Sequence, residues 1–281
     1  CLAQINNASS EPFNFNVTEI IVLDNGNIFK GIDGGKVTTD NNIEITADEF
    51  EHIKDINLLT ATGNAIMNDY NNDIQITANQ FEYQKNINLI KATGNVVLHD
   101  KTKDAKIYTN EIYYDKNKEE IYTKGKTNST IDEEITIKSS NVLFKRNENS
   151  LSSSNFTEVE DKQKRLYKLD SFKYFITEEL LKGNNVKIFD ITNDEYFMKE
   201  GFFDLKKKKF SAQDLKINFK KDLFDDIKND PRLFGVTANG DDNNIIVQKG
   251  VFTTCQKTDK CPPWKVVAKE IHHDKRKKRI T

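Results

Sequence analysis

Cysteine and histidine are the residues of this 281-residue chain whose chemistry is most distinctive, and there are three cysteines and four histidines. Cys255 and Cys261 are separated by five residues and precede a Pro-Pro-Trp segment at 262–264. Together with the His pair at 272–273 they could bind zinc, but their spacing matches no common zinc motif. In an exported chain a disulfide is the stronger interpretation, either between the two or with cysteines elsewhere. Cys255 and Cys261 are therefore candidate disulfide residues, and no metal is predicted.

Patterns typical of catalysis are missing from the sequence. His52 and His99 have no Cys, Asp or Glu partner at a recognisable spacing, and no Gly-rich phosphate loop, nucleophile elbow or zinc-protease motif occurs. The acidic pairs at 225–226 and 241–242 lie in turn-like contexts and are best interpreted as surface charge. We therefore predict that the chain is not an enzyme and uses no cofactor.

Both ends of the sequence carry information about location. Small residues in Cys1-Leu2-Ala3 are spaced as at a signal-peptidase site. Cys1 is then the remnant of a signal peptide, a mature cysteine in a disulfide, or a lipid-anchored N-terminus, and all three agree with export. Residues 265–281 contain seven Lys or Arg and two Asp or Glu. This basic end is either a solvated hairpin turn or a contact for anionic sugar or phosphate.

The composition excludes several classes of protein. The 42 basic and 44 acidic side chains give a net charge of −2, so no global positive field predicts nucleic-acid binding. No run of about 18 apolar residues predicts a transmembrane helix. The 18 Phe and 9 Tyr argue against disorder, and the four Pro with abundant Asn suit turns between many short strands.

An internal repeat of 31 residues is the strongest signal in the sequence. Residues 43–69 and 74–100 are identical at fifteen positions, including the segment Ala-Thr-Gly-Asn. Weaker copies follow from residue 107 and from residue 135, and another precedes them at 17–37. Each copy holds two stretches with apolar residues at every second position, which indicates half-buried strands. Later stretches at 186–189, 196–205, 210–219 and 245–252 have the same pattern, so we predict an all-β fold.

Apolar residues occupy the same alternating positions in each copy of the repeat, which predicts one apolar inner face. Gly63, Gly94 and Gly125 lie in mid-strand, where glycine indicates a bend or bulge. A sheet bent around this face either fills it with side chains, as in a structural β-solenoid without ligand, or leaves a groove for acyl chains. The predicted inner-face and groove residues are Ile43, Ile45, Ile74, Ile76, Phe81, Leu89, Val96, Leu98, Ile107, Ile112 and Ile137.

Two blocks of the sequence carry a resemblance to a known family. The tandem A-D-x-F-x-Y and A-T-G-N-V pattern resembles the lipopolysaccharide-transport domain of the organic-solvent-tolerance (OstA-like) superfamily. Its residues are Ala47, Asp48, Phe50, Phe81, Tyr83 and Ala92 to Val96. The later block resembles the segment where the outer-membrane lipopolysaccharide-assembly family (LptD) passes from its N-terminal periplasmic domain to its barrel. That block consists of Gly250 to Cys255, Cys261 to Trp264, Ala268, Ile271 and Asp274.

The resemblance implies an open β-jelly-roll whose apolar groove passes lipopolysaccharide toward a C-terminal outer-membrane barrel absent from this sequence. It implies three partners: lipopolysaccharide, a periplasmic bridge protein joined by edge-strand addition, and a lipoprotein that plugs the barrel. It also implies a disulfide to the barrel from Cys255 or Cys261. We expect the strand at 17–23 to be the free edge, with Val17, Ile20 and Val22 as contact residues.

The resemblance also implies a division of the chain. Residues 1–12 are then a signal-peptide remnant or disordered, 13–250 are the jelly-roll, and 251–281 are a junction leading to the barrel. The implied location is the periplasmic side of the outer membrane. A soluble periplasmic bridge or carrier protein is the alternative within the same family.

Overall fold

The structure, a computed structural model, describes residues 13–189, 194–221, 229–256, 258 and 263–281. The regular structure of these residues is almost entirely β-strand, with short 3-10 turns between some strands. All the strand pairs described here are antiparallel, which confirms the predicted all-β antiparallel fold class. The chain divides into two compact units between Thr123 and Lys124, and each is described by itself below.

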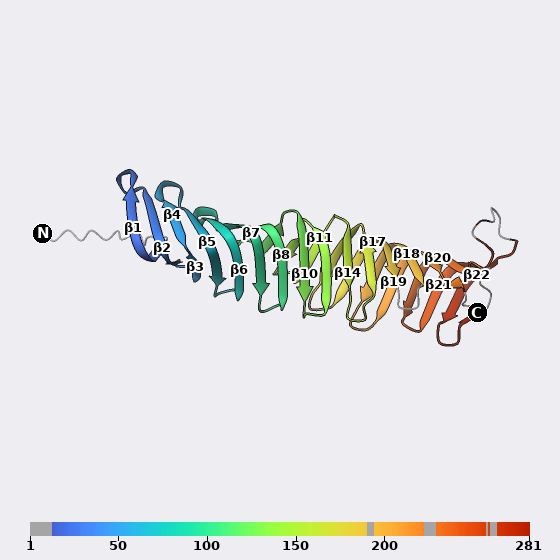
Figure 1. The fold of residues 1–281 in the computed structure, drawn as a ribbon. Coiled ribbons are helices and arrows are strands. Elements are labelled where there is room, and N and C mark those ends of the chain that lie inside the picture. The colour runs from blue at the N-terminus through green and yellow to red at the C-terminus, as the bar shows by residue number, and fades with distance from the viewer. Residues whose placement is uncertain (1–12, 190–193, 222–228, 257, 259–262) are drawn as a thin grey trace. The chain divides into compact units, whose positions relative to one another are not determined.

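The first unit is a series of long strands joined by tight turns, coloured blue to green in Figure 1. Its elements are β1 (Asn14–Leu23), η1 (Asp24–Gly26), β2 (Ile28–Thr38), β3 (Ile43–Ala47), β4 (Glu49–Ile53), η2 (Lys54–Ile56), β5 (Leu58–Asp69), β6 (Ile74–Gln84), η3 (Lys85–Ile87), β7 (Leu89–Asp100), β8 (Ala105–Asp115) and β9 (Glu120–Thr123). Strands β5 to β8 pair in sequence order, and β3 and β4 both pair with β2 and β5.

Each long strand of this unit bends at a bulge near its middle. The β5–β6 register shifts between Thr62 and Ala65, and Gly63 within that bulge has a φ of +82°. Gly94, one repeat later, has a φ of +80° inside the matching bulge of β7. This left-handed region strains residues that carry a Cβ, so glycine suits both bends. The predicted mid-strand bends at Gly63 and Gly94 are confirmed, and the sheet folds over its inner face as expected of an open jelly-roll. Gly125 differs from the prediction, because the chain leaves the sheet there and Gly125 lies between β9 and the strand at 126–131.

The turns of successive repeats are hydrogen-bonded to one another, which explains the abundance of Asn. Asn57 and Asn88 end η2 and η3 in the left-handed conformation that Asn tolerates. The backbone amide of Lys85 donates to the carbonyl of Asn57 at 3.1 Å. The side-chain amide of Asn57 donates to Asn86 at 2.8 Å, and that of Asn88 donates to Asn117 at 2.9 Å. Turns 31 residues apart therefore stack as a polar ladder.

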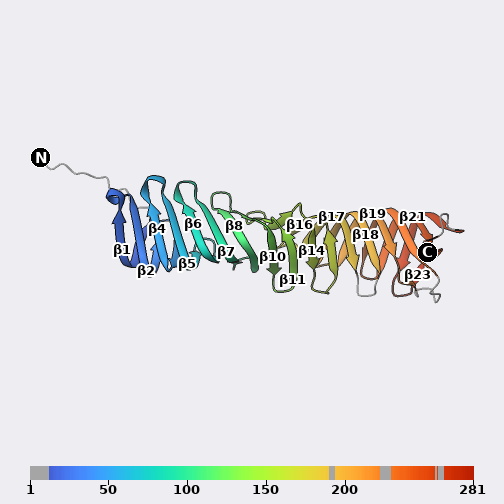
Figure 2. The ribbon, with the colours of Figure 1, turned by 45° about the horizontal axis from the view of Figure 1, so that its top comes forward.

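The second unit continues the antiparallel pattern with shorter strands. Its strands are β10 (Lys126–Ile131), β11 (Ile135–Ser140), β12 (Leu143–Lys145), β13 (Ser150–Ser153), β14 (Thr157–Glu160), β15 (Leu166–Leu169), β16 (Ser171–Phe175), β17 (Leu180–Phe189), β18 (Glu195–Asp204), β19 (Lys209–Asn218), β20 (Arg232–Asp241), β21 (Asn244–Thr253), β22 (Val266–Asp274) and β23 (Arg279–Ile280). Figure 2 shows β17 to β23 following one another in this unit.

Strand β17 joins two series of short strands in this unit. Its C-terminal half pairs with β15, β15 pairs with β14, and β14 pairs with β11. Its N-terminal half pairs with β16, β16 pairs with β13, and β13 pairs with β12. From β17 onward, long strands pair in sequence order to β22. The two series of short strands thus take the place of the two halves of a bent long strand.

The observed division differs from the segments expected from the sequence. The boundary between the two units lies inside the 13–250 segment, where the composition gave no signal of a linker. The expected boundary at 250/251 lies within β21, which pairs with β22. The assignment of 251–281 as a junction stays a prediction, and residues 1–12 lie outside the described residues.

Candidate binding interior and partner edge

The predicted inner face is largely buried. Ten of the eleven predicted residues have at most 2% of their surface exposed: Ile43, Ile45, Ile74, Ile76, Phe81, Val96, Leu98, Ile107, Ile112 and Ile137. The two repeats also place Phe50 and Phe81 at similar depth, 3% and 0% exposed. The period-2 pattern therefore located the interior correctly, while ligand binding by these residues stays a prediction.

Leu89 is the exception, and its placement corrects the predicted register. Its side chain is only half-buried, whereas Ile90 beside it is fully buried. Ile90 lies between Tyr83 on β6 and Tyr114 on β8, which both point inward. Because Leu89 and Ile90 are both apolar, the alternating pattern does not show which of them faces the interior at the start of the strand. Packing against the two tyrosines places Ile90 there.

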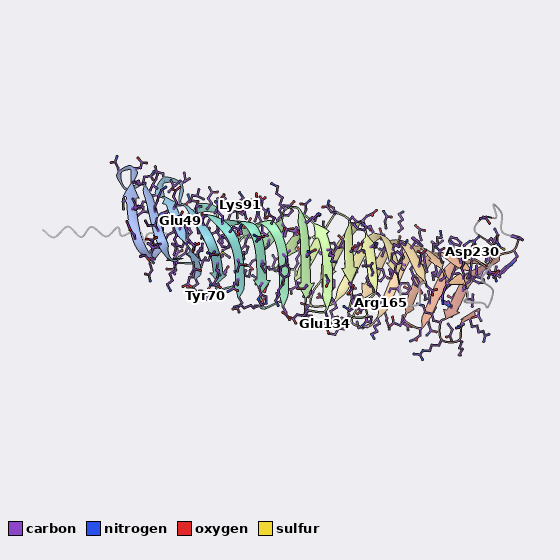
Figure 3. The ribbon with its side chains drawn as sticks, viewed as in Figure 1. Glu49, Tyr70, Lys91, Glu134, Arg165 and Asp230 are labelled. Atoms are coloured by element: carbon purple, nitrogen blue, oxygen red, sulfur yellow. The ribbon has the colours of Figure 1, made fainter. Side chains whose placement is uncertain are left out.

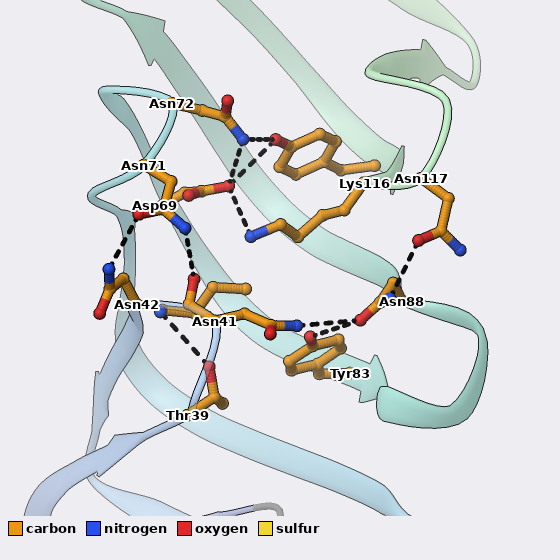
Figure 4. A network of polar contacts seen from close by, with 12 residues as sticks. Thr39, Asn41, Asn42, Asp69, Asn71, Asn72, Tyr83, Asn88, Lys116 and Asn117 are labelled. Carbon is orange, nitrogen blue, oxygen red and sulfur yellow. Dashed lines mark hydrogen bonds and ion pairs between the residues drawn. The ribbon is translucent and has the colours of Figure 1, made fainter.

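Side chains fill the interior of the first unit, and polar groups close its margin. Figure 4 shows Asp69, whose carboxylate accepts a hydrogen bond from the Tyr114 hydroxyl at 3.0 Å and lies 2.9 Å from the Lys116 ammonium. Asn72 donates to the same carboxylate oxygen at 3.0 Å. Burial raises the pKa of the nearby Tyr83 hydroxyl to about 12, so it stays protonated and donates to Asn88. These contacts link neighbouring strands and turns at the margin of the fold.

The interior of the second unit contains a cavity of about 340 Å³ that sequence reasoning missed. Its apolar wall comes from strands β15, β17, β18 and β19, and its margin from the turns that follow β14, β18, β20 and β22. Arg165, labelled with other outward-pointing side chains in Figure 3, belongs to this margin. The sequence signal was weak: four consecutive lysines at 206–209 between Phe203 and Phe210.

Strand β1 forms the edge of the first unit, as predicted. Its described pairing is with β2, and Figures 1 and 2 both show it as the outermost strand. Ile20, Ile21, Val22 and Leu23 are 48%, 37%, 53% and 44% exposed, so apolar side chains protrude from both faces of the strand. Natural edge strands usually carry Lys, Pro or other features that prevent pairing, and β1 has neither of these residues. Its edge position is confirmed, while its partner stays a prediction.

The structure describes only some of the candidate disulfide cysteines and candidate metal ligands. Cys255 is buried as a free thiol whose sulfur lies 3.5 Å from the carbonyl oxygen of Trp264. Cys261 and Cys1 lie outside the described residues, so the predicted disulfide is not tested. Within the described ranges no group of three His, Cys, Asp or Glu side chains could hold a metal ion.

His273, which the sequence offered as a zinc ligand, is instead a core residue. Its ring is 3% exposed and packs edge-on against Phe219 with 4.8 Å between centroids. Burial, aided by the charge of Lys275, lowers the pKa of His273 to about 4, so the ring is neutral near pH 7. His272 beside it is exposed and lies 2.6 Å from Glu270.

Comparison with known proteins gives one family match. Residues 38–139 match the model of the lipopolysaccharide-assembly, LptC-related family. No curated protein has a matching sequence. Among solved structures, one similar fold is LptH, the LptA-homologous periplasmic component of the lipopolysaccharide transport device of Pseudomonas aeruginosa. That similarity has a TM-score of 0.33 and 10% identity, and it covers 52% of this chain and 83% of LptH. Among the described residues, no helix has the length and apolar character needed to cross a membrane.

Proposed function

We propose that this chain is a periplasmic component of lipopolysaccharide transport, of the bridge or carrier type. The match of residues 38–139 to the LptC-related assembly family is the observation that carries the proposal. It favours a bridge component over the LptD-type outer-membrane translocon, because the matching model is that of a different member of the transport system. Outer-membrane attachment and a barrel-plugging lipoprotein partner belong to the LptD interpretation and have no separate support.

The apolar inner face gives the proposal its physical mechanism. Each acyl CH₂ that leaves water contributes about 0.8 kcal/mol, so a continuous apolar surface holds a lipid while its sugar stays hydrated. In the first unit this surface is closed, since Ile76 and Leu98 are fully buried. Acyl chains therefore enter only if the two halves of the bent sheet separate. The non-enzymatic character predicted from the sequence agrees with a mechanism that breaks no bond.

The exposed edge strand β1 supports assembly with another transport component. Edge-strand addition uses main-chain donors and acceptors for affinity and alternate side-chain pockets for specificity. The exposed side chains of Ile20 and Val22 supply apolar contacts beside the free edge. We propose that a partner of the same transport system pairs with β1.

A structural β-solenoid without ligand is the second candidate, and the filled interior of the first unit favours it. Photo-crosslinking residues placed at Ile76 and Val96 on the inner face, and at Glu82 on the outer face of β6, distinguish the two functions. We expect the inner positions to capture lipopolysaccharide in cells and Glu82 not to. Capture at none of the three positions would favour the solenoid, and equal capture at all three would exclude a selective interior.

A further inference from the structure

The cavity of the second unit has an aromatic and aliphatic wall. Its apolar lining consists of Tyr167, Ile188, Tyr196, Met198, Phe203 and Phe210. The rings of Tyr167 and Phe203 meet edge-on with 5.1 Å between centroids, and Phe203 stacks on Phe210 at 6.4 Å. A volume of about 340 Å³ is at the lower end of the range of about 300–1,000 Å³ for small-molecule pockets. The cavity therefore has room for one apolar chain rather than for a bundle of chains.

Basic side chains dominate the cavity margin. Lys208 in the β18–β19 turn and Lys209 at the start of β19 are exposed, and Lys275 and Arg276 belong to the β22–β23 turn. The Lys275 ammonium lies 4.8 Å from the centre of the Tyr196 ring, which places a cation directly beside the apolar wall. This arrangement suits an anionic group at the opening of the cavity.

The acidic residues of the margin are engaged within the protein. Asp204 accepts the backbone N–H of Lys207 at 2.8 Å, which lowers the pKa of the Asp204 carboxyl and closes its own turn. Asp241 accepts the backbone N–H groups of Asn243 and Asn244, both at 2.8 Å. Asp242 lies 2.8 Å from the guanidinium of Arg165. The backbone hydrogen bonds from Asn243 and Asn244, and also the charges of Lys209 and Arg276, lower the pKa of the Asp241 carboxyl. The lining still holds five basic and three acidic side chains, so the margin carries a net positive charge.

We infer that this cavity binds a single acyl chain that carries an anionic head group, with the chain against the aromatic wall and the head group at the lysine-rich margin. Two sources have this chemistry: a single-chain amphiphile such as a fatty acid or lysophospholipid, and one chain of a larger glycolipid. The inference concerns this cavity alone and does not require the proposed transport function.

Titration calorimetry of the 281-residue chain with octyl, decyl and dodecyl phosphate, each below its micelle concentration, tests the apolar wall. Each buried CH₂ should tighten binding about fourfold, so each two-carbon step should tighten it by roughly an order of magnitude until the cavity is full. An affinity independent of chain length would overturn the inference, because a surface ion site does not sense the chain.

Paired lysine variants test the margin. The K208Q/K209Q double variant should weaken dodecyl phosphate binding about tenfold, while neutral dodecyl maltoside binds as before. The K199Q/K206Q double variant removes the same charge from β18 and the β18–β19 turn, but neither residue lines the cavity. It should bind dodecyl phosphate within about twofold of the unmodified chain. Equal losses in the two variants would show general surface attraction and overturn the inference.

Competition with lipopolysaccharide separates the two sources. Displacement of dodecyl phosphate by lipopolysaccharide identifies a glycolipid chain as the occupant, and undisturbed binding identifies a single-chain amphiphile; both outcomes support the site. If lipopolysaccharide crosslinks to the inner face while alkyl phosphates do not bind, the cavity inference fails and the proposed function stands. If alkyl phosphates bind but lipopolysaccharide crosslinks nowhere, the cavity inference stands and the proposed transport function fails.

Discussion

The hydroxyl of Tyr114 donates a hydrogen bond of 3.0 Å to the carboxylate of Asp69, although the two residues are 45 positions apart and on strands that do not pair directly. The Asp69 side chain is completely buried, and the ammonium of Lys116 lies 2.9 Å from the same oxygen with 10% of its side chain exposed. A repeat-built sheet therefore holds a buried ion pair at its margin, reinforced by a phenol from three strands away (Figure 4).

Replacing Asp69 with Asn should destabilise the first unit by about 3 kcal/mol, because the Lys116 charge then stays buried without its counter-ion. Chemical denaturation measures this change. Glu44→Gln is the matched control, since Glu44 forms an ion pair of 3.1 Å with the more exposed Lys36. That variant should change stability by less than about 1 kcal/mol. Similar effects of the two variants would contradict a special role for the buried pair.

Three glycines spaced by 31 residues allow backbone strain to be separated from steric clash. Gly63, Gly94 and Gly125 have φ values of +82°, +80° and +83°. A Cβ on Gly63 would lie 2.4 Å from a carboxylate oxygen of Asp48, and one on Gly94 would lie 2.5 Å from the side-chain nitrogen of Asn79. A Cβ on Gly125 would meet no atom within 4 Å.

Alanine at Gly125 should therefore cost about 1–2 kcal/mol from strain alone. Alanine at Gly63 or Gly94 should cost more, because Asp48 or Asn79 must also move. Thermal and chemical denaturation of the three single variants provide the comparison. An equal loss of stability at all three positions would mean that the Asp48 and Asn79 side chains move away from the new Cβ without an energetic penalty.

The strand pattern and its inner face were predictable because period-2 alternation, repeated at an offset of 31, leaves little freedom in register. The bends at Gly63 and Gly94 were predictable for a related reason, since glycine in mid-strand has few other structural uses. Gly125 was misplaced because the third copy of the repeat is interrupted between β9 and β10. Leu89 was misplaced because Leu89 and Ile90 are both apolar, and only contact with Tyr83 and Tyr114 selects one of them.

Other features depend on tertiary structure and had no local signal. The first repeat splits into β3 and β4 at Asp48, while its later copy runs unbroken as β6. At Asp48 the backbone instead bonds to Gly63 and Gly34, at 3.0 and 2.8 Å. The cavity of the second unit was missed because residues from four strands and four turns line it, and a space between side chains has no sequence pattern.

His273 should make folding stability depend on pH. Its pKa is lowered to about 4 in the folded chain, against about 6.5 when unfolded, mainly because burial penalises the charged ring. Between these values the unfolded state binds more protons, so stability falls as pH decreases from about 6.5 to 4. Protonation of this one residue should lower the free energy of unfolding by about 3 kcal/mol over that range. Above pH 7 it should have no such effect.

The His273→Phe variant preserves an aromatic ring against Phe219 and removes the titration. Its unfolding free energy, measured by denaturation from pH 4 to 7, should therefore fall less on acidification than that of the unmodified chain. His272→Gln, on the exposed neighbour, is the control and should retain most of the original slope. Identical slopes for the His273→Phe variant and the unmodified chain would place the acid sensitivity elsewhere.

The last prediction concerns the free edge of β1, where Ile20 and Ile21 are adjacent in the strand. Successive N–H groups of a strand point to opposite sides, so one of these two points toward β2 and the other toward the open edge. Proline removes the N–H at its own position. Ile20→Pro and Ile21→Pro therefore form a matched pair in which one variant loses a bond within the sheet and the other loses a donor available to a partner.

We expect one of the two variants to retain its stability yet bind a purified lipopolysaccharide-bridge component at least several-fold more weakly, because edge pairing requires the outward donor. The other should lose stability, because it breaks the ladder to β2. Surface plasmon resonance with the bridge component and denaturation of each variant measure the two effects separately. Unchanged partner binding by a stable variant with the outward N–H removed would exclude β1 as the docking edge, even though its side chains are exposed.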